Sequence, residues 1–177
     1  MIRVSLRGVV VLDKPTWCFR VIVVSDRIAE NPKEDVSGEV ARSYLERRGY
    51  CVGEKIIVRN NYREILKAIR ETNDRVLVLI GGTGLSPRDI TVDIVKSTAW
   101  RCIPGFGEFF RSISAQSIGY RAILSRADLC VLYDGRVVAA LPGTPQSVEL
   151  GLSILVDFID HLIEEIDRFE GLHRCEV

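Results

Sequence analysis

The stretch Val76-Leu77-Val78-Leu79-Ile80-Gly81-Gly82-Thr83-Gly84-Leu85-Ser86-Pro87-Arg88-Asp89 decides the fold. Its five consecutive apolar residues, with no polar alternation, predict a strand that is buried on both faces. Glycines follow that strand directly, and glycine lets backbone N–H groups approach an anion closely. Ligands of open parallel α/β sheets bind at this carboxyl end of the strands. The stretch therefore predicts a central strand with a candidate binding loop at its end.

The segments before this stretch alternate between strand and helix patterns. Strands are predicted over 19–24, 50–58 and 75–80, and helices over 37–48, with Ser37 as the N-cap, and over 62–72. A polar loop that contains Asp26 is expected between the first strand and the first helix. This order predicts right-handed crossovers and a parallel sheet.

The second half of the chain departs from that order. After a short helix over 91–96, an extended segment over 97–103 and a turn at 104–107, helical segments are predicted over 108–118 and 121–125. Strands over 128–133 and 137–141 flank an Asp-Gly pair, which predicts an antiparallel hairpin. A long apolar helix over 146–168 follows. The predicted fold class is α/β, with a mostly parallel sheet that ends in an antiparallel hairpin.

Composition limits the classes of function. A chain of 177 residues is predicted to form a single domain, with an N-terminal arm over 1–15 and a fraying tail over 170–177. The arm could be an edge strand or an intersubunit arm. The formal net charge of zero argues against nucleic-acid binding. No apolar run approaches the roughly 18 residues that a membrane span needs, so no membrane association is predicted.

The five cysteines are predicted to be free thiols. Their number is odd and none form a C-x-x-C pair, which argues against both a zinc site and a disulfide framework. Cys51 and Cys130 lie in apolar runs and are expected to be small buried side chains. This pattern fits a reducing compartment and predicts a cytoplasmic protein.

The glycine loop is the strongest chemical signal in the chain. Its spacing matches neither the dinucleotide fingerprint nor a P-loop. One interpretation is a backbone nest for phosphate, with a hydroxyl from Thr83 and with Arg88 at the rim. The other is a tight turn that needs positive φ. Asp89 could bind Mg²⁺ or be a carboxylate stabilised by a helix dipole.

Three further clusters are expected at the same edge of the sheet. They are Asp26 with Ser37-Gly38, then Asn60-Asn61, and the rigid loop 142–145. The N–H groups of the loop 142–145 favour the binding of an anion, and the alternative is that this loop is a plain structural turn. His161 and His173 suit neither a catalytic triad nor a metal cluster. The remaining chemistry is phosphate binding beside a carboxylate, with positioning and electrostatics as the catalytic means.

The combined motifs resemble the MogA/MoaB family of molybdenum cofactor biosynthesis, the molybdopterin adenylyltransferase-type domain also found in gephyrin. The matching pieces occur in family order between about residues 19 and 155: Asp35-Val36-Ser37-Gly38, Ile80-Gly81-Gly82-Thr83-Gly84, Arg88-Asp89-Ile90-Thr91, Gly105-Phe106-Gly107-Glu108, Ile123-Leu124-Ser125-Arg126-Ala127 and Leu141-Pro142-Gly143-Thr144-Pro145-Gln146-Ser147-Val148.

The resemblance implies a three-layer α/β/α sandwich that assembles as a homotrimer or homohexamer. The implied activity is ATP- and Mg²⁺-dependent adenylylation of molybdopterin, which releases pyrophosphate. The adenylylated product is then charged with molybdate or tungstate.

The resemblance also implies roles for individual residues. Asp89 is the functional aspartate of its Arg-Asp motif, and Asp89 and Asn60 are the candidate catalytic and Mg²⁺-binding residues. The candidate substrate- and nucleotide-binding residues are Asp26, Ser37, Gly38, Gly81, Gly82, Thr83, Gly84, Arg88, Pro142, Gly143, Thr144 and Ser147.

One position departs from the family pattern. Adenylylating members usually carry an acidic residue in a Val-Pro-Asp-like context, whereas this chain reads Val58-Arg59-Asn60-Asn61. If Asn60 takes that place, a negative charge near the metal is missing, and an amide oxygen is the weaker Mg²⁺ ligand. Two hypotheses follow, an adenylyltransferase and a molybdopterin-binding carrier or scaffold with little turnover. A third is a related domain that acts on another phosphorylated small molecule.

Overall fold

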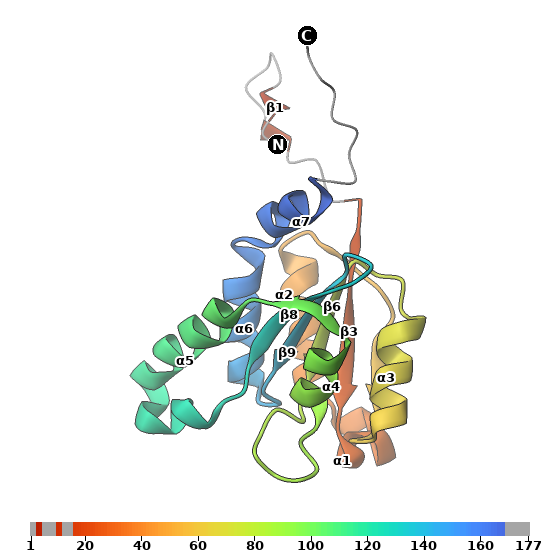
Figure 1. Cartoon of the computed structure of the whole chain (residues 1–177), viewed down its shortest axis with the longest axis vertical. Coiled ribbons are helices and arrows are strands. Elements are labelled where there is room, and N and C mark those ends of the chain that lie inside the picture. The colour runs from red at the N-terminus through yellow and green to blue at the C-terminus, as the bar shows by residue number, and fades with distance from the viewer. Residues whose placement is uncertain (1–2, 5–9, 12–15, 169–177) are drawn as a thin grey trace.

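A mixed β-sheet forms the middle layer of the protein, and helices cover both of its faces (Figure 1). The computed structural model describes residues 3–4, 10–11 and 16–168. The strands of this sheet are β3 (Cys18–Val24), β4 (Cys51–Val52), β5 (Ile56–Val58), β6 (Val76–Ile80), β7 (Ala99–Cys102), β8 (Asp128–Leu132) and β9 (Val137–Leu141). Their order in the sheet is β4-β3-β6-β9-β8-β7, and β5 also pairs with β3.

The helices form the two outer layers. They are α1 (Asp26–Glu30), η1 (Pro32–Glu34), α2 (Val36–Arg47), α3 (Tyr62–Glu71), α4 (Thr91–Thr98), α5 (Pro104–Ile118), η2 (Gly119–Leu124), α6 (Pro145–Val156) and α7 (Ile159–Asp167). Helices α2, α5 and α6 pack on one face of the sheet, and α3 and α4 pack on the other. The three-layer α/β/α architecture is therefore confirmed. In the described part of the chain, no helix combines the length and apolarity needed to cross a membrane.

Strand β6 is the centre of the sheet, as its sequence predicts. It pairs in parallel with β3 on one side and β9 on the other, and all of its side chains are buried. Successive side chains of a strand point to opposite faces. Val76, Val78 and Ile80 therefore pack against the α2–α5–α6 layer, whereas Leu77 and Leu79 pack against the α3–α4 layer. Both layers depend on this one uninterrupted apolar run.

The antiparallel hairpin at the carboxyl-terminal end of the sheet is also confirmed. Strands β8 and β9 pair antiparallel, and Gly135 in their turn has φ of 82°. Strand β7 pairs antiparallel with β8 as well. The strands β3, β5, β6 and β9 are mutually parallel, so their carboxyl ends meet at one edge of the sheet.

Two predicted elements are divided in the structure. The strand predicted over 50–58 is two strands, because its register against β3 shifts. Val52 lies opposite Phe19 and Ile56 lies opposite Ile22, so one extra residue separates β4 from β5. The helix predicted over 146–168 is α6 followed by α7. Phe158 between them has φ of −135°, which an α-helix cannot accommodate.

Several predicted boundaries were wrong. Asp35, and not Ser37, is the N-cap of α2, because its side chain accepts from the backbone of Gly38. Helix α5 begins at Pro104 instead of residue 108, since proline suits the first helical position. The polar segment after β3 holds α1 and η1, so Asp26 lies at the start of a short helix.

Part of the predicted N-terminal arm is a small two-stranded sheet. Strands β1 (Arg3–Val4) and β2 (Val10–Val11) pair antiparallel, separately from the main sheet. The rest of the arm over 1–15, and the tail predicted over 170–177, lie outside the described residues.

The prediction of free cysteines was wrong. Disulfides join Cys18 to Cys51 and Cys102 to Cys130. The partners are 33 and 28 residues apart in sequence, and each pair occupies directly opposite positions on adjacent strands. Only the pairing of the strands in the folded sheet brings these cysteines together, so sequence spacing could not reveal them. Cys130 is buried as expected, but Cys51 is exposed. The cysteines therefore no longer argue for a reducing compartment.

Candidate functional site

A pocket of about 760 Å³ opens at the carboxyl edge of the parallel strands. Four loops converge on it, as the sequence predicts: those after β3, β5, β6 and β9. The predicted site residues that line it are Ser37, Asn60, Gly81, Gly82, Thr83, Gly84, Asp89, Pro142, Gly143 and Thr144. Four other predicted residues are not among its lining, namely Asp26, Gly38, Arg88 and Ser147.

The glycine loop turns sharply away from β6. Gly81 and Gly82 have φ values of 103° and 63°, a region that residues with a side chain rarely adopt. A Cβ on Gly81 would lie 2.4 Å from the carbonyl oxygen of Val24. The interpretation as a turn that requires positive φ is therefore confirmed. The same conformation brings an uncovered backbone against the pocket, which the phosphate-nest interpretation also needs.

Arg126 fixes the shape of this loop, and sequence reasoning did not select it. Its guanidinium donates to the carbonyl oxygens of Gly84 (2.9 Å) and Asp89 and pairs with both carboxylate oxygens of Asp93 (2.9 and 3.0 Å). Arg126 precedes β8 and reaches the loop across more than 30 residues of chain. Its place in a family motif was the available signal. By binding loop carbonyls, it keeps their negative ends away from an anionic ligand.

Asp89 lies in the pocket wall beyond the glycines. Its Oδ2 accepts from the backbone N–H of Ser86 (3.1 Å), and its own N–H donates to the Ser86 carbonyl (2.8 Å). Ile90 is the N-cap of α4, so Asp89 is not the capping residue of that helix. One carboxylate oxygen is thus held by the loop, and the group is presented to the pocket.

Asn60 contributes an oxygen that has no hydrogen-bond donor. Its backbone N–H donates to Asp26 Oδ1 (3.0 Å), which fixes the turn after β5. Its side-chain Oδ1 is buried and unpartnered, and the buried Thr91 Oγ1 is unpartnered as well. A Cβ on Gly82 would lie 2.8 Å from the first and 2.2 Å from the second. An unpaired buried acceptor is costly, so this corner suits a cation or a water molecule.

Two helices start at the pocket. Thr144 is the N-cap of α6 and its Oγ1 accepts from the N–H of Ser147 (3.3 Å). Because Asp35 caps α2, the hydroxyl of Ser37 is free to donate to the carbonyl of Gly143 (2.7 Å). This bond ties the start of α2 to the loop before α6. The amino-terminal ends of helices carry a partial positive charge that favours anions.

A buried ion pair supports the start of α2. Lys55 Nζ lies 2.6 Å from Oδ2 of the buried Asp35 and 2.6 Å from Glu39 Oε1. Burial lowers the pKa of Lys55, but the hydrogen bonds to both carboxylates outweigh it, so the pKa of Lys55 is raised. A Cβ on Gly38 would lie 2.2 Å from Asp35 Oδ2. Gly38 therefore allows this ion pair to form beneath the pocket.

Asp26 and Arg88 lie close together at the rim. Arg88 Nη1 is 3.8 Å from Asp26 Oδ2, and the Arg88 side chain is 83% exposed. An exposed pair of this kind contributes little to stability. The Arg88 cation is consequently free to turn toward a bound anion.

The description "Probable molybdopterin binding domain" belongs to a family model that matches residues 20–161. The molybdopterin adenylyltransferase of Pyrococcus furiosus is 34% identical over 155 residues, which are 84% of this chain and 90% of that protein. The molybdenum cofactor biosynthesis protein B of Halalkalibacterium halodurans is 36% identical over 138 residues, 75% of this chain and 81% of that protein.

Solved structures agree with these sequence matches. The crystal structure of the tungsten cofactor synthesizing protein MoaB from Pyrococcus furiosus superposes with a TM-score of 0.79 at 32% identity. The match covers 86% of this chain and 98% of that one. The similarity therefore extends over the sheet, both helical layers and the pocket.

Replacing Arg126 with Gln is expected to loosen the glycine loop. The loss of charged hydrogen bonds to Gly84 and Asp89 should lower the free energy of unfolding by about 1.5–3 kcal/mol. Amide hydrogen exchange in residues 83–90 should become faster, as measured by mass spectrometry of peptides from this region. The exposed Arg121→Gln is the matched control. Unchanged exchange in Arg126→Gln would show that the loop holds its shape without this side chain.

Proposed function

Because the chain belongs to the MogA/MoaB family of molybdopterin-binding, molybdenum cofactor biosynthesis proteins, we propose that it is a molybdopterin adenylyltransferase. The proposed reaction joins the terminal phosphate of molybdopterin to the α-phosphorus of ATP. The bond between the α- and β-phosphates breaks, and pyrophosphate leaves with the electron pair. The product is molybdopterin-AMP, which is then ready to receive molybdate or tungstate.

One observation carries this proposal. The pocket brings together a positive-φ glycine loop, the starts of α2 and α6, and side-chain oxygens of Asn60 and Asp89. Backbone donors and helix starts suit phosphate oxygens, and carboxylate and amide oxygens suit a divalent cation. A reaction between two phosphorylated molecules requires both kinds of group within one site.

In this proposal the chain acts by positioning and by electrostatics. In the loop from Gly81 to Gly84, the backbone N–H groups of residues 82–84 bind phosphate oxygens, and Thr83 adds a hydroxyl. The N–H of Gly81 donates to the carbonyl oxygen of Leu141, so Gly81 contributes the turn. Ser37, Pro142, Gly143 and Thr144 line the side that receives the pterin and its phosphate. Arg88 turns inward from the rim to offset negative charge. Ser147 acts indirectly by fixing Thr144, and Gly38 acts through the start of α2.

The residues present fit Mg²⁺. The orphaned, buried Oδ1 of Asn60 is an acceptor that needs an electropositive partner, and one carboxylate oxygen of Asp89 is held by Ser86 while the group faces the pocket. Both are oxygen ligands of the kind that Mg²⁺ takes. Bound there, Mg²⁺ would offset the charge of the triphosphate and of the departing pyrophosphate. Asp89 and Asn60 would hold it.

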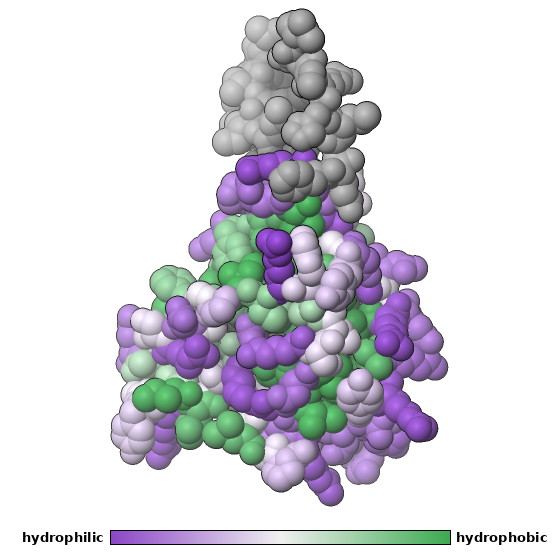
Figure 2. Space-filling view, in the orientation of Figure 1, coloured by the Kyte–Doolittle hydropathy of each residue, from purple (hydrophilic) through white to green (hydrophobic). Residues whose placement is uncertain are grey.

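An exposed apolar surface supports assembly into a homotrimer or homohexamer. Along α5 and η2, the side chains of Phe109, Ile118, Tyr120, Ile123 and Leu124 are between 54% and 82% exposed. Green atoms gather on this flank at the lower left of Figure 2, where α5 and η2 lie in Figure 1. Leu124 also lines the pocket, so a second copy docked here would approach the site.

A second candidate function is a molybdopterin carrier or scaffold with little turnover. The observation that favours it is the amide at Asn60, in a place where adenylylating relatives are expected to carry a carboxylate. The carboxylate of Asp26 is a poor substitute for that missing charge, because its Oδ1 already accepts a hydrogen bond from the backbone N–H of Asn60. The two functions share the pocket and differ in whether the reaction proceeds.

An adenylylation assay with purified protein, molybdopterin, ATP and Mg²⁺ tests the main proposal. Asp89→Ala is expected to reduce turnover by at least about a hundredfold while the protein stays folded, because a preorganised charge is lost. Asp89→Asn keeps an acceptor for the Ser86 N–H. Comparing it with Asp89→Ala therefore separates the effect of the lost charge from the effect of the lost hydrogen bond in the turn. Product formation is measured by chromatography and folding by circular dichroism. Full activity in Asp89→Ala would refute the role of this carboxylate.

Replacing Asn60 with Asp is expected to raise turnover in the same assay, because a carboxylate is the stronger Mg²⁺ ligand. The neighbouring Asn61→Asp is the matched control, since it makes the same charge change at the N-cap of α3, where both residues are accepted. A wild-type protein that binds molybdopterin without forming product would favour the carrier. A protein that does not bind it at all would favour another phosphorylated substrate.

Sedimentation velocity tests the proposed assembly. The wild-type chain is expected to sediment as a trimer or hexamer, and Ile123→Asp, which places a charge on the apolar surface, should dissociate it. Tyr133→Asp is the control, since Tyr133 is 80% exposed and lies in the turn between β8 and β9. A monomeric wild-type chain would contradict the assembly.

A further inference from the structure

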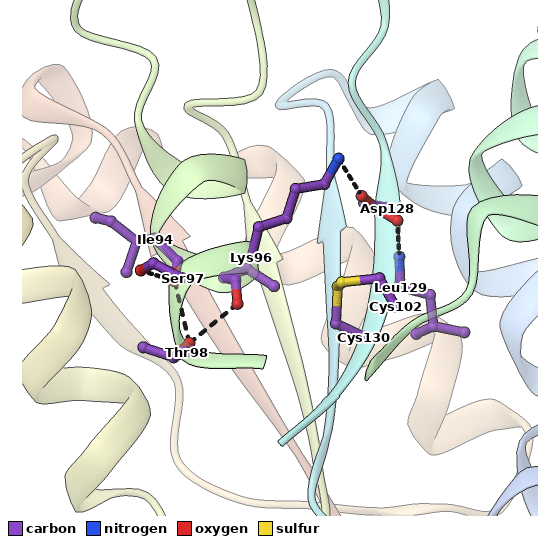
Figure 3. The surroundings of a disulfide bond; sticks show 9 residues. Ile94, Lys96, Ser97, Thr98, Cys102, Asp128, Leu129 and Cys130 are labelled. Atoms are coloured by element: carbon purple, nitrogen blue, oxygen red, sulfur yellow. Dashed lines mark hydrogen bonds and ion pairs between the residues drawn. A yellow bond between two sulfur atoms is a disulfide. The ribbon is translucent and has the colours of Figure 1, made fainter. Parts of the chain in front are cut away.

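Three potential metal ligands meet beneath helix α4, away from the pocket. Asp128 and Cys130 are two residues apart in β8 and therefore share one face of the sheet. Cys102 is the antiparallel partner of Cys130 on β7. The two sulfur atoms and a carboxylate oxygen all lie within 4.8 Å of one another. Figure 3 shows the disulfide and the carboxylate side by side, with Lys96 reaching toward the latter.

We propose that these residues form a zinc site in the reduced protein, and that the Cys102–Cys130 disulfide is the oxidised state of the same site. Thiolate sulfur and carboxylate oxygen are ordinary Zn²⁺ ligands. The disulfide and the metal exclude each other, because both use the same sulfur electron pairs. The site thus joins β7 to β8 by a covalent bond in one state and by a metal in the other.

The geometry permits this exchange. In a tetrahedral zinc site with Zn–S bonds of about 2.3 Å, two sulfurs lie roughly 3.8 Å apart. The Cα atoms of Cys102 and Cys130 are 3.9 Å apart, and the Cβ atoms of disulfide-bonded cysteines lie about 3.5–4.5 Å apart, so side-chain rotation alone can open the sulfurs to that distance. The backbone N–H of Leu129 donates to Asp128 Oδ1 (2.9 Å), which orients the carboxylate as outer-shell hydrogen bonds do in metal sites.

The charges balance as well. Two thiolates, one carboxylate and one Zn²⁺ sum to −1, and Lys96 Nζ lies 3.0 Å from Asp128 Oδ2 to offset it. Asp128 and Cys130 are buried, which protects the ligands. The Lys96 side chain is 57% exposed, so solvent reaches this side and a water molecule can complete the four ligands.

A small dithiol is the reductant that converts the Cys102–Cys130 disulfide into two thiols. The dithiol gives two electrons and two protons to the protein disulfide, and it is itself oxidised to a cyclic disulfide. Zn²⁺ then binds the two thiols and displaces two protons. Either state encloses residues 102–130, the segment that carries α5, η2 and Arg126.

The chain contains its own control. Cys18 and Cys51 also form a disulfide between adjacent strands. Within the part of the chain that the structure describes, the clustered group of potential ligands is the one around Cys130, and it does not include Cys18 or Cys51. Reduction of the Cys18–Cys51 pair should therefore give two thiols without a third ligand.

Zinc titration of two full-length variants tests the proposal. The first keeps only Cys102 and Cys130, and the second keeps only Cys18 and Cys51, with Ser at the remaining cysteines in each. Both are reduced with a dithiol and desalted without oxygen, and Zn²⁺ is measured by competition with a coloured chelator. The first variant is expected to bind one Zn²⁺ per chain, and the second is expected to bind none.

Asp128→Asn in the first variant is expected to weaken zinc binding at least about tenfold, because it removes a ligand charge with little change of shape. The exposed Asp157→Asn is the control. Oxidation of the first variant before zinc addition should abolish binding. The proposal is overturned if the first variant binds no Zn²⁺, if the second binds it equally, if the oxidised protein binds it, or if Asp128→Asn has no effect. The same Asp128→Asn substitution in the otherwise unchanged chain keeps all five cysteines, so it decides the question even where a cysteine variant unfolds.

Discussion

The burial of β6 on both faces is the constraint on which the rest of the structure depends. Parallel neighbours on each side satisfy its backbone groups, and apolar side chains from two helical layers cover it. Such a strand can end only where the chain leaves the sheet, and it does so at Gly81. The N–H of Gly81 still donates to the carbonyl oxygen of Leu141 (2.9 Å), and at the next residue the chain turns away from β9. The pocket is the space left where this central strand stops.

The glycine loop that follows β6 has to expose backbone N–H groups to the pocket and still keep a fixed shape. Positive φ at Gly81 and Gly82 provides the turn, and Arg126 provides the rigidity. The Arg126 guanidinium donates to carbonyl oxygens of the loop, and the Asp89 carboxylate, itself part of the loop, accepts from the Ser86 N–H. A single arginine from the segment before β8 therefore contributes to the polarity of the site, because it occupies the acceptors that would repel an anion.

The cysteines show how a sheet creates chemistry that sequence spacing hides. Both disulfides join directly opposite positions on neighbouring strands, although the paired cysteines are 33 and 28 residues apart in the sequence, with helices between them. One pair lies at each side of the sheet, near the strands that have fewest neighbours. Cross-links at these positions oppose the separation of the outer strands. Each also closes a loop that carries part of the pocket wall, Ser37 in one and Leu124 in the other.

The sequence by itself determined the central strands, most of the helices and the place of the site. The apolar run at 76–80, the glycines after it and the Asp-Gly turn each express local chemistry, namely two-sided burial, positive φ and hairpin geometry. The family motifs added the three layers. Only the tertiary structure decided how Asn60 and Thr91 are left without partners beside Gly82, that Lys55 pairs with Asp35 at the start of α2, and which cysteines meet. Those outcomes depend on contacts between segments that are distant in the chain. No local pattern encodes them, because the distances that decide them exist only after the sheet has formed.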